Sequence, residues 1–160
     1  MAKAKSAVPE GHHTVTPQLT LDNAVQALEW YKKALGAEEV SRAAGPDGKI
    51  MHADITIGDS HIMLNDAMMG MKGPKGYGGS PASFWLYVEN SDALFKRAIE
   101  AGAKEQMPMA DQFWGDRAGS IADPAGFSWW IASRKEDLAL EDIRKRAEEV
   151  FKKMGTPAAP

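Results

Sequence analysis

Two stretches of the sequence decide the fold: LDNAVQALEWYKKALGA at residues 21–37 and VENSDALFKRAIEAGA at residues 88–103. Each passes through an acidic residue and an Asn, continues with apolar side chains at helical spacing, and ends at Gly-Ala. Asn23 and Asn90 suit helix N-caps, because a short side-chain acceptor satisfies a free backbone N–H group of the first turn. The glycine of each Gly-Ala pair suits the left-handed position just past a helix. The chain therefore contains an internal repeat.

Apolar residues alternate with polar ones before and after each predicted helix, which indicates half-buried strands. Each copy also contains a return strand after a tight turn, at Gly58–Ser60 in the first copy and at Asp123–Gly126 in the second. We therefore expect two β-α-β-β-β modules, each with its helix on one face of its sheet. The apolar stripe by which each predicted helix packs on its sheet consists of Val25, Leu28, Tyr31 and Leu35 in the first copy and of Leu94, Phe95, Ala98 and Ile99 in the second.

A Gly- and Pro-rich stretch separates the two copies. It lacks the residue order of a phosphate-binding loop, and Met68, Met69 and Met71 make it either an apolar lid or a linker collapsed on the surface. After the second copy, Glu136 to Met154 reads as an amphipathic helix, packed on its own domain or sealing a subunit interface. We predict a flexible arm (1–12), one domain (13–133, with module one 13–66, linker 67–82 and module two 83–133), a C-terminal helix (134–155) and a disordered tail (156–160).

The composition excludes several classes of protein. The chain has 160 residues, 44% of them hydrophobic and 26% charged, as is typical of one globular domain. Its formal net charge of -3 provides no basic excess to neutralise the phosphates of a nucleic acid. No stretch approaches the roughly 18 apolar residues of a membrane span, and no apolar secretory signal is visible. The sequence has 0 cysteines, which excludes disulfides and thiolate chemistry. From these features together we expect a cytoplasmic protein without nucleic-acid or membrane partners.

Several short motifs are typical of one known superfamily. They are the run from Asn23 through Trp30-Tyr31 to Leu35-Gly36-Ala37, the Asp123-Pro124-Ala125-Gly126 turn, Gly45-Pro46-Asp47-Gly48, Gly115-Asp116-Arg117 and Trp129. On these residues the sequence resembles the vicinal oxygen chelate superfamily, also called the glyoxalase/bleomycin resistance/dioxygenase group. Within that group it is most similar to the PhnB-like bacterial subfamily. The likeness covers roughly residues 13–133 and is specific for fold rather than for chemistry.

The resemblance implies an α+β fold in which the two modules form a curved mixed sheet around a cavity, usually within a homodimer. Metal-dependent members place ligands on cavity-facing strand positions, typically a His in the first strand and a Glu in the last strand of each module. Those positions fall here on Thr16, Met63 (or Asn65 in a register shifted by two), Ser83 and Trp130. None of these side chains suits a divalent ion, so we expect no metal and no other cofactor, with one divalent ion as the alternative.

Two polar positions remain candidates for acid/base catalysis. His52 shares a strand face with Asp54, opposite the apolar stripe, and is either a catalytic group or a wet residue at the sheet edge. Asp116 is the second candidate, and the neighbouring Arg117 suits a carboxylate or phosphate unless the two simply form a surface ion pair. Since adjacent strand residues point to opposite faces, we expect only one of Asp116 and Arg117 to face the cavity.

The other histidines carry weaker expectations. His61 follows a tight turn and is predicted to be exposed. His12 and His13 lie where the first strand is expected to start, and adjacent strand residues cannot chelate an ion together. His13 alone is within reach of the cavity rim.

Aromatic residues are the most informative part of the predicted cavity. If Phe84 and Leu86 pack against the helix, then Trp85 and Tyr87 face the cavity, and Trp130 joins them by the same alternation. Such rings suit the stacking of a flat ligand, unless they fill the concave face as ordinary core. The expected ligand-binding residues are Thr16, Gln18, His52, Ser83, Trp85, Tyr87, Trp114, Arg117 and Trp130.

Two classes of function follow from these expectations. The first, which we favour, is a metal-free homodimeric protein that binds a small planar organic molecule in an aromatic cavity. The second is a lyase, isomerase or dioxygenase-type enzyme of the same superfamily, using a displaced metal or metal-free chemistry with His52 or Asp116. The sequence contains no motif that names the ligand.

Overall fold

A computed structural model describes residue 4 and residues 6–155, so the predicted tail 156–160 lies outside the described residues. The strands form two four-stranded sheets, sheet A in the order β1-β4-β3-β2 and sheet B in the order β5-β8-β7-β6. In each sheet the first strand runs parallel to the last, and the other neighbours are antiparallel. The elements are β1 (Gln18–Leu21), α1 (Ala24–Leu35), β2 (Glu38–Ala44), β3 (Ile50–Ile57), β4 (Ser60–Asp66), η1 (Pro74–Tyr77), β5 (Ser83–Tyr87), α2 (Ser91–Glu100), β6 (Lys104–Asp111), β7 (Asp116–Ala122), β8 (Ser128–Arg134) and α3 (Leu140–Met154).

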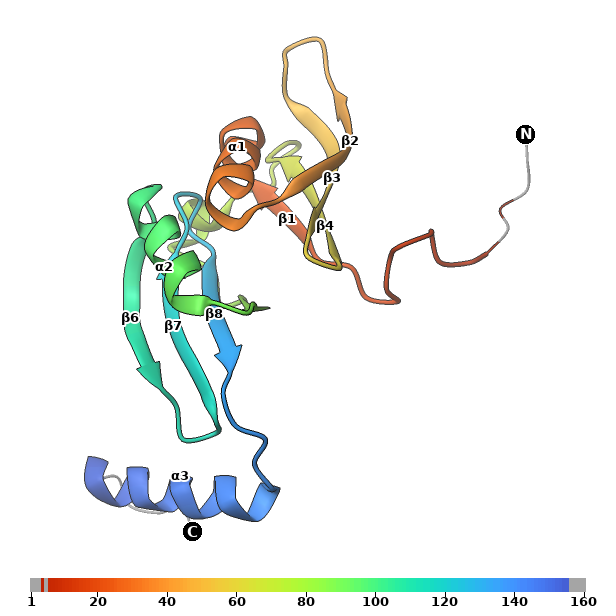
Figure 1. The fold of residues 1–160 in the computed structure, drawn as a ribbon. Helices are drawn as coiled ribbons and strands as arrows, with labels where there is room; N and C mark the ends of the chain where they lie inside the picture. The colour runs from red at the N-terminus through yellow and green to blue at the C-terminus, as the bar shows by residue number, and fades with distance from the viewer. Residues whose placement is uncertain (1–3, 5, 156–160) are drawn as a thin grey trace. The chain divides into compact units, whose positions relative to one another are not determined.

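This arrangement confirms the predicted α+β fold of two β-α-β-β-β modules followed by a C-terminal helix (Figure 1). Contacts divide the chain into two compact units, one around sheet A and one around sheet B. The β7–β8 turn, Asp123–Phe127, belongs by its contacts to the unit of sheet A. Helix α1 contacts β1, β3 and β4, while α2 contacts β6, β7 and β8, so each helix lies on its own sheet.

Both predicted N-caps are present. The Asn23 side chain accepts a hydrogen bond from the backbone N–H of Gln26, and Asn90 accepts one from Ala93. Gly36 follows α1 at φ 74°, a left-handed conformation that glycine adopts without steric cost. The predicted stripe of α1 is wrong at Val25, which is 39% exposed. The other stripe residues, Leu28, Tyr31 and Leu35, are buried as predicted. Ala24, Ala27 and Trp30, each one position before a residue of the predicted stripe, are buried as well.

One side chain near the end of the last strand fixes the helix of each module. Asp66, at the end of β4, accepts hydrogen bonds from the backbone N–H groups of Ala24 at 2.8 Å and Ile50 at 2.7 Å. The Ser133 hydroxyl, near the end of β8, accepts one from the N–H of Ser91 at 2.9 Å. All three N–H donors are buried away from water, where an unpaired donor would be costly.

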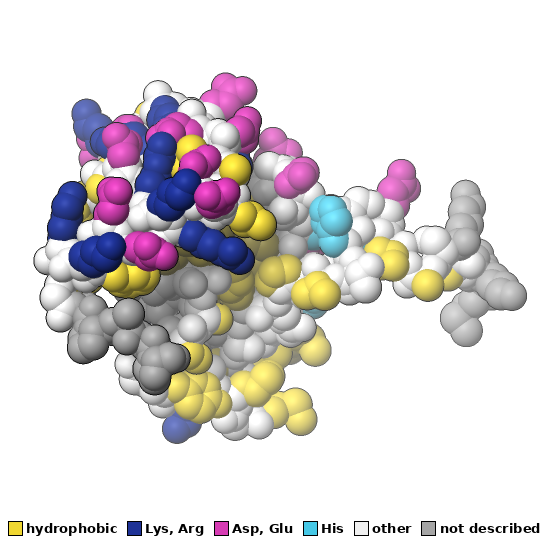
Figure 2. Space-filling model, turned by 90° about the horizontal axis from the view of Figure 1, so that it is seen from below, with side chains coloured by type: hydrophobic (Ala, Val, Ile, Leu, Met, Phe, Trp, Pro, Cys, Tyr) yellow, Lys and Arg dark blue, Asp and Glu magenta, His cyan; other side chains and the backbone are white. Residues whose placement is uncertain are grey.

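Helix α3 differs from the prediction in two respects. It begins at Leu140 rather than Glu136, because the backbone N–H groups of Lys135 and Glu136 both donate to the carbonyl oxygen of Gly115. Within α3, all of which the structure describes, no residue is buried. Figure 2 shows charged side chains of both signs gathered over the face where this helix lies. Among the described residues, no helix has the length and apolar character that crossing a membrane requires.

Replacing Asp66 should test how strongly the last strand holds the helix. We expect Asp66→Ala to lower the free energy of unfolding by about 2–4 kcal/mol, since two buried N–H donors lose a charged acceptor. Urea unfolding followed by circular dichroism measures this change. The exposed Asp59→Ala is the control and should shift stability by less than about 0.5 kcal/mol. Equal effects of the two substitutions would contradict this account of the module.

Candidate functional site

The face of sheet B that lies opposite α2 carries exposed aromatic rings. In the parallel pair β5–β8, Trp85 is the partner of Trp130, and alternation places Tyr87 on the same face. We call Trp85, Tyr87 and Trp130 the aromatic face. The next residue along β8, Trp129, is only 2% exposed and packs on Phe84 on the other side of the sheet, at 4.9 Å between ring centroids.

The rings of the aromatic face are arranged in contact with one another. Trp85 and Trp130 stack with centroids 4.8 Å apart and planes 1° from parallel. Tyr87 lies 6.0 Å from Trp85 with an interplanar angle of 26°. Trp114, from the turn between β6 and β7, meets Trp85 edge-on at 6.1 Å. Despite these contacts Trp85 and Tyr87 remain 43% and 56% exposed, so the rings are not filled in as core by the described residues.

A buried carboxylate holds the polar edge of the aromatic face. Asp116 is 2% exposed, and its Oδ2 accepts hydrogen bonds from the Tyr87 hydroxyl at 2.9 Å and from Trp114 Nε1 at 3.0 Å. Its Oδ1 is buried and has no hydrogen-bond partner among the described residues. Burial, together with the hydrogen bond to Asp116, raises the pKa of the Tyr87 hydroxyl.

Arg117 points away from this site. Its guanidinium donates to the Asp92 carboxylate of α2 at 2.6 Å and 2.8 Å, and to Asp111 at 3.2 Å. The hydrogen bond from Arg117 lowers the pKa of Asp92. Asp116 therefore lies on the aromatic face of sheet B, whereas Arg117, which was predicted to bind the ligand, lies on the helix face and is paired with acidic residues.

Polar side chains line the corresponding face of sheet A, opposite α1. Gln18 Nε2 donates to Asn65 Oδ1 at 2.8 Å, and the Thr20 hydroxyl donates to the same oxygen at 3.3 Å. Thr16, which lies before β1, donates instead to the backbone carbonyl of His13. The positions at which the resemblance predicts the superfamily's metal ligands carry no imidazole and no carboxylate, which a divalent ion would need; they are Thr16, Met63 (or Asn65), Ser83 and Trp130.

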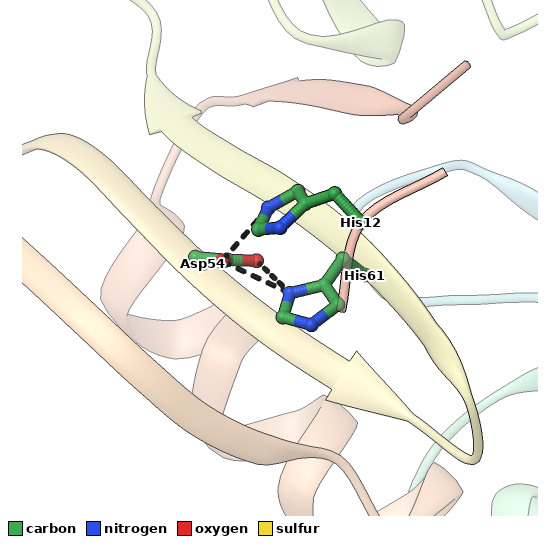
Figure 3. Close-up of side chains that lie close together, drawn as sticks. All are labelled: His12, Asp54 and His61. Carbon is green, nitrogen blue, oxygen red and sulfur yellow. Dashed lines mark hydrogen bonds and ion pairs between the residues drawn. The ribbon is translucent and has the colours of Figure 1, made fainter. Parts of the chain in front are cut away.

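The structure corrects the prediction for two histidines (Figure 3). His61 was expected to be exposed, yet its side chain is only 12% exposed and its Nδ1 lies 3.0 Å from Asp54 on β3. His12 was expected at the start of the first strand, whereas β1 begins at Gln18 and His12 lies in an earlier turn with Nε2 3.2 Å from Asp54. His52, the predicted partner of Asp54, is exposed instead.

Part of the cluster of His12, Asp54 and His61 could have been found from the sequence. In the β3–β4 hairpin, Asp54 is opposite Met63 and Thr56 is opposite His61, so the register alone places Asp54 diagonally from His61. The turn that brings His12 back over the sheet leaves no comparable pattern. His13, next to it, is exposed and belongs to no cluster of possible metal ligands within the described residues.

Comparisons with known proteins agree with this architecture. The family model of the Glyoxalase/Bleomycin resistance protein/Dioxygenase superfamily matches residues 12–131. An uncharacterized protein of Mycobacterium tuberculosis is 38% identical over 135 residues, covering 81% of this chain and 79% of the relative. Protein YjdN of Escherichia coli is 29% identical over 134 residues, covering 68% of this chain and 86% of YjdN.

Solved structures show the same fold at low identity. TioX from Micromonospora sp. ML1 has a TM-score of 0.61 at 22% identity, covering 79% of this chain and 100% of TioX. A PhnB protein from Bacillus cereus has a TM-score of 0.59 at 18% identity, covering 76% of this chain and 99% of that protein. These two likenesses concern the fold alone.

The hydrogen bond between Tyr87 and Asp116 can be tested by titration. Asp116→Leu removes the carboxylate that opposes ionisation of the phenol, so the Tyr87 pKa should fall toward its ordinary value of about 10. The chain has 3 tyrosines, whose ring-carbon NMR signals report each pKa separately. The pKa of Tyr31, raised by its own burial and by Asp123, should stay where it is. An unchanged Tyr87 pKa in the variant would contradict the assigned hydrogen bond.

Proposed function

Because the chain belongs to the Glyoxalase/Bleomycin resistance protein/Dioxygenase superfamily, we propose that it binds a small planar organic molecule against the aromatic face of sheet B. One observation carries the proposal. Trp85 and Tyr87 are 43% and 56% exposed, yet stacking with neighbouring rings holds them in place. A fixed, exposed ring surface binds a flat molecule at little cost in side-chain entropy. The motif residues Gly115-Asp116-Arg117 and Trp129 support placing the chain in the PhnB-like subfamily.

The hydrogen bonds at the edge of the aromatic face select the polarity of the ligand. Tyr87 and Trp114 each have one side-chain donor, and both donate it to Asp116, so neither offers an N–H or O–H to a ligand. The Tyr87 hydroxyl oxygen keeps lone pairs that accept hydrogen bonds. We therefore propose a planar heteroaromatic ligand that carries an N–H donor on its edge.

Catalysis by the candidate acid/base residues has less support than binding. His52 is exposed, and the Asp116 carboxylate is buried and already accepts two hydrogen bonds. A general base has to lie within hydrogen-bonding reach of the proton that it removes. Binding by stacking makes no demand of this kind, and it uses residues of the aromatic face that are accessible.

We propose further that the protein is a homodimer in which α3 packs on the α3 of a second copy. The helix exposes Leu140, Phe151 and Met154, at 74%, 52% and 69%. Its first turn carries Glu141 and Asp142, whereas its last turn carries Lys152 and Lys153. Two such helices packed antiparallel across a two-fold axis cover the apolar residues and bring each acidic end to a basic end.

Ligand binding can be tested with 9-aminoacridine, a planar heteroaromatic with amino donors. We expect the chain to bind it in the presence of a chelator, as measured by isothermal titration calorimetry. Trp85→Ala and Trp130→Ala should each weaken binding about tenfold, because a ring pair contributes on the order of 0.5–1.5 kcal/mol. Trp129→Phe, on the opposite face of the same sheet, is the matched control. Acridine-9-carboxylate, which carries an anion in place of the donor, should bind more weakly. Wild-type affinity in both Ala variants would show that the ligand binds elsewhere.

The assembly can be tested by sedimentation velocity at micromolar concentration. The wild-type chain should sediment as a dimer, and Phe151→Glu should shift it to a monomer by placing a charge in the helix pair. Met69→Glu adds the same charge at a fully exposed loop residue and should leave the dimer intact. A wild-type monomer would rule out the proposed assembly.

A further inference from the structure

We propose that His12, Asp54 and His61 bind one divalent transition-metal ion of the Zn²⁺ class (Figure 3). The three side chains come from the turn before β1, from β3 and from β4, all in the unit of sheet A. Their exposures are 11%, 8% and 12%, so the ligand atoms are shielded from water by the fold itself. None of the three residues belongs to the aromatic face on which the ligand of sheet B is proposed to bind.

The distances match those of a metal site. His12 Nε2 lies 3.2 Å from Asp54 Oδ2, and His61 Nδ1 lies 3.0 Å from Asp54 Oδ1. Ligand bonds of about 2.0–2.1 Å in a tetrahedron place the ligand atoms about 3.3 Å apart. All three ligand atoms lie within 4.8 Å of one another, so one nitrogen of each imidazole and the Asp54 carboxylate are close enough to share an ion at the edges of the two rings.

The hydrogen-bonding pattern of His12 also points to a cation. Its Nδ1 lies 3.3 Å from the backbone carbonyl oxygen of Glu10, and its Nε2 faces the Asp54 carboxylate. Both neighbours are acceptors; an imidazolium donates to both, whereas a neutral imidazole has only one N–H. In the neutral form with Nδ1–H donating to Glu10, the Nε2 lone pair faces a carboxylate oxygen. A metal ion between these two atoms turns that unfavourable contact into two ligand bonds, with the Glu10 carbonyl fixing the tautomer.

The ligand set selects the class of ion. Two imidazoles and one carboxylate suit Zn²⁺ and its first-row neighbours, whereas Mg²⁺ and Ca²⁺ prefer oxygen ligands throughout. Three protein ligands leave a fourth position of the ion for water or another small ligand. The three groups together carry one negative charge when both imidazoles are neutral, which favours a divalent cation.

The turn before β1 is shaped to bring His12 onto His61. The backbone N–H of His12 donates to the carbonyl of Pro9 at 3.1 Å, and Gly11 adopts φ +79°. A Cβ at Gly11 would lie 2.9 Å from His61 Nε2, so only glycine allows this approach. The two imidazole rings stack with centroids 4.0 Å apart. Gly11 thus positions both histidines without being a ligand itself.

The site differs from the superfamily's own ligand positions. Those fall in this unit on Thr16 and Met63, which supply neither imidazole nor carboxylate. Met63 is the strand partner of Asp54, so the proposed ion lies one strand over, toward β3, and takes its third ligand from the turn before β1. Binding the ion would fix this turn to sheet A.

The test uses the untagged, full-length chain after treatment with a chelator and dialysis. Calorimetric titration should show one Zn²⁺ per chain with micromolar or tighter affinity, and no binding of Mg²⁺. Co²⁺ should give the visible absorption of a low-coordinate nitrogen and oxygen site. His12→Ala, Asp54→Asn and His61→Ala should each weaken Zn²⁺ binding at least a hundredfold. The matched controls are His13→Ala, next to His12, and His52→Ala, on the same strand as Asp54; both should bind as the wild type does.

A second variant separates geometry from loss of a ligand. Gly11→Ala keeps every proposed ligand but disturbs the turn, so it should weaken Zn²⁺ binding at least tenfold while the far-ultraviolet circular dichroism stays native. Zn²⁺ should also raise the melting temperature of the wild type but not of His12→Ala, because an ion stabilises only the state that binds it. Failure of the wild type to bind Zn²⁺, or wild-type affinity for Zn²⁺ in His12→Ala and His61→Ala, would overturn the proposal. Equal losses in the His13→Ala and His52→Ala controls would overturn it too.

Discussion

The hydrogen bond from the first backbone N–H of each helix to a side chain near the end of the last strand is the constraint on which both modules depend. Asp66 accepts it in the unit of sheet A, and Ser133 accepts it in the unit of sheet B. Because a helix N-terminus has no partners of its own, this contact fixes where the helix begins on its sheet. With one face of each sheet covered in this way, polar and aromatic side chains gather on the other face.

The two free faces have diverged in chemistry although they share one topology. On sheet A the side chains include amides, hydroxyls, a carboxylate and an imidazole, with Asn65 accepting from both Gln18 and Thr20. On sheet B, tryptophan rings stand opposite each other at Trp85 and Trp130. A duplicated fold therefore does not imply a duplicated site, because strand parity fixes only which positions face outward and leaves their identity free.

Strand parity and helix caps are the parts of the structure that could be predicted from the sequence. The alternation of Phe84, Leu86 and Val88 correctly puts Trp85 and Tyr87 on the opposite face, since a period of two leaves no other choice. The start of α3 could not be predicted, because it depends on a distant contact of Glu136 with Gly115. His61 was missed for a related reason: a residue after a tight turn is usually exposed, and here an earlier turn covers it. The closure of that turn depends on the left-handed Gly11 and leaves no periodic signal.

A buried carboxylate on the third strand organises each free face, and its partners decide what the face can bind. Asp116 on β7 holds Tyr87 and Trp114, whose hydroxyl and indole N–H groups can only donate to it at this contact. Because both groups point a hydrogen at the carboxylate, neither directs a lone pair at an ion beside it. These two hydrogen bonds instead fix the rings of Tyr87 and Trp114. Asp54 on β3 holds His12 and His61 instead, and an imidazole nitrogen can exchange its proton for a metal ion. The same arrangement of one carboxylate between two side chains thus supports two different proposals, a planar organic ligand on sheet B and a metal ion on sheet A.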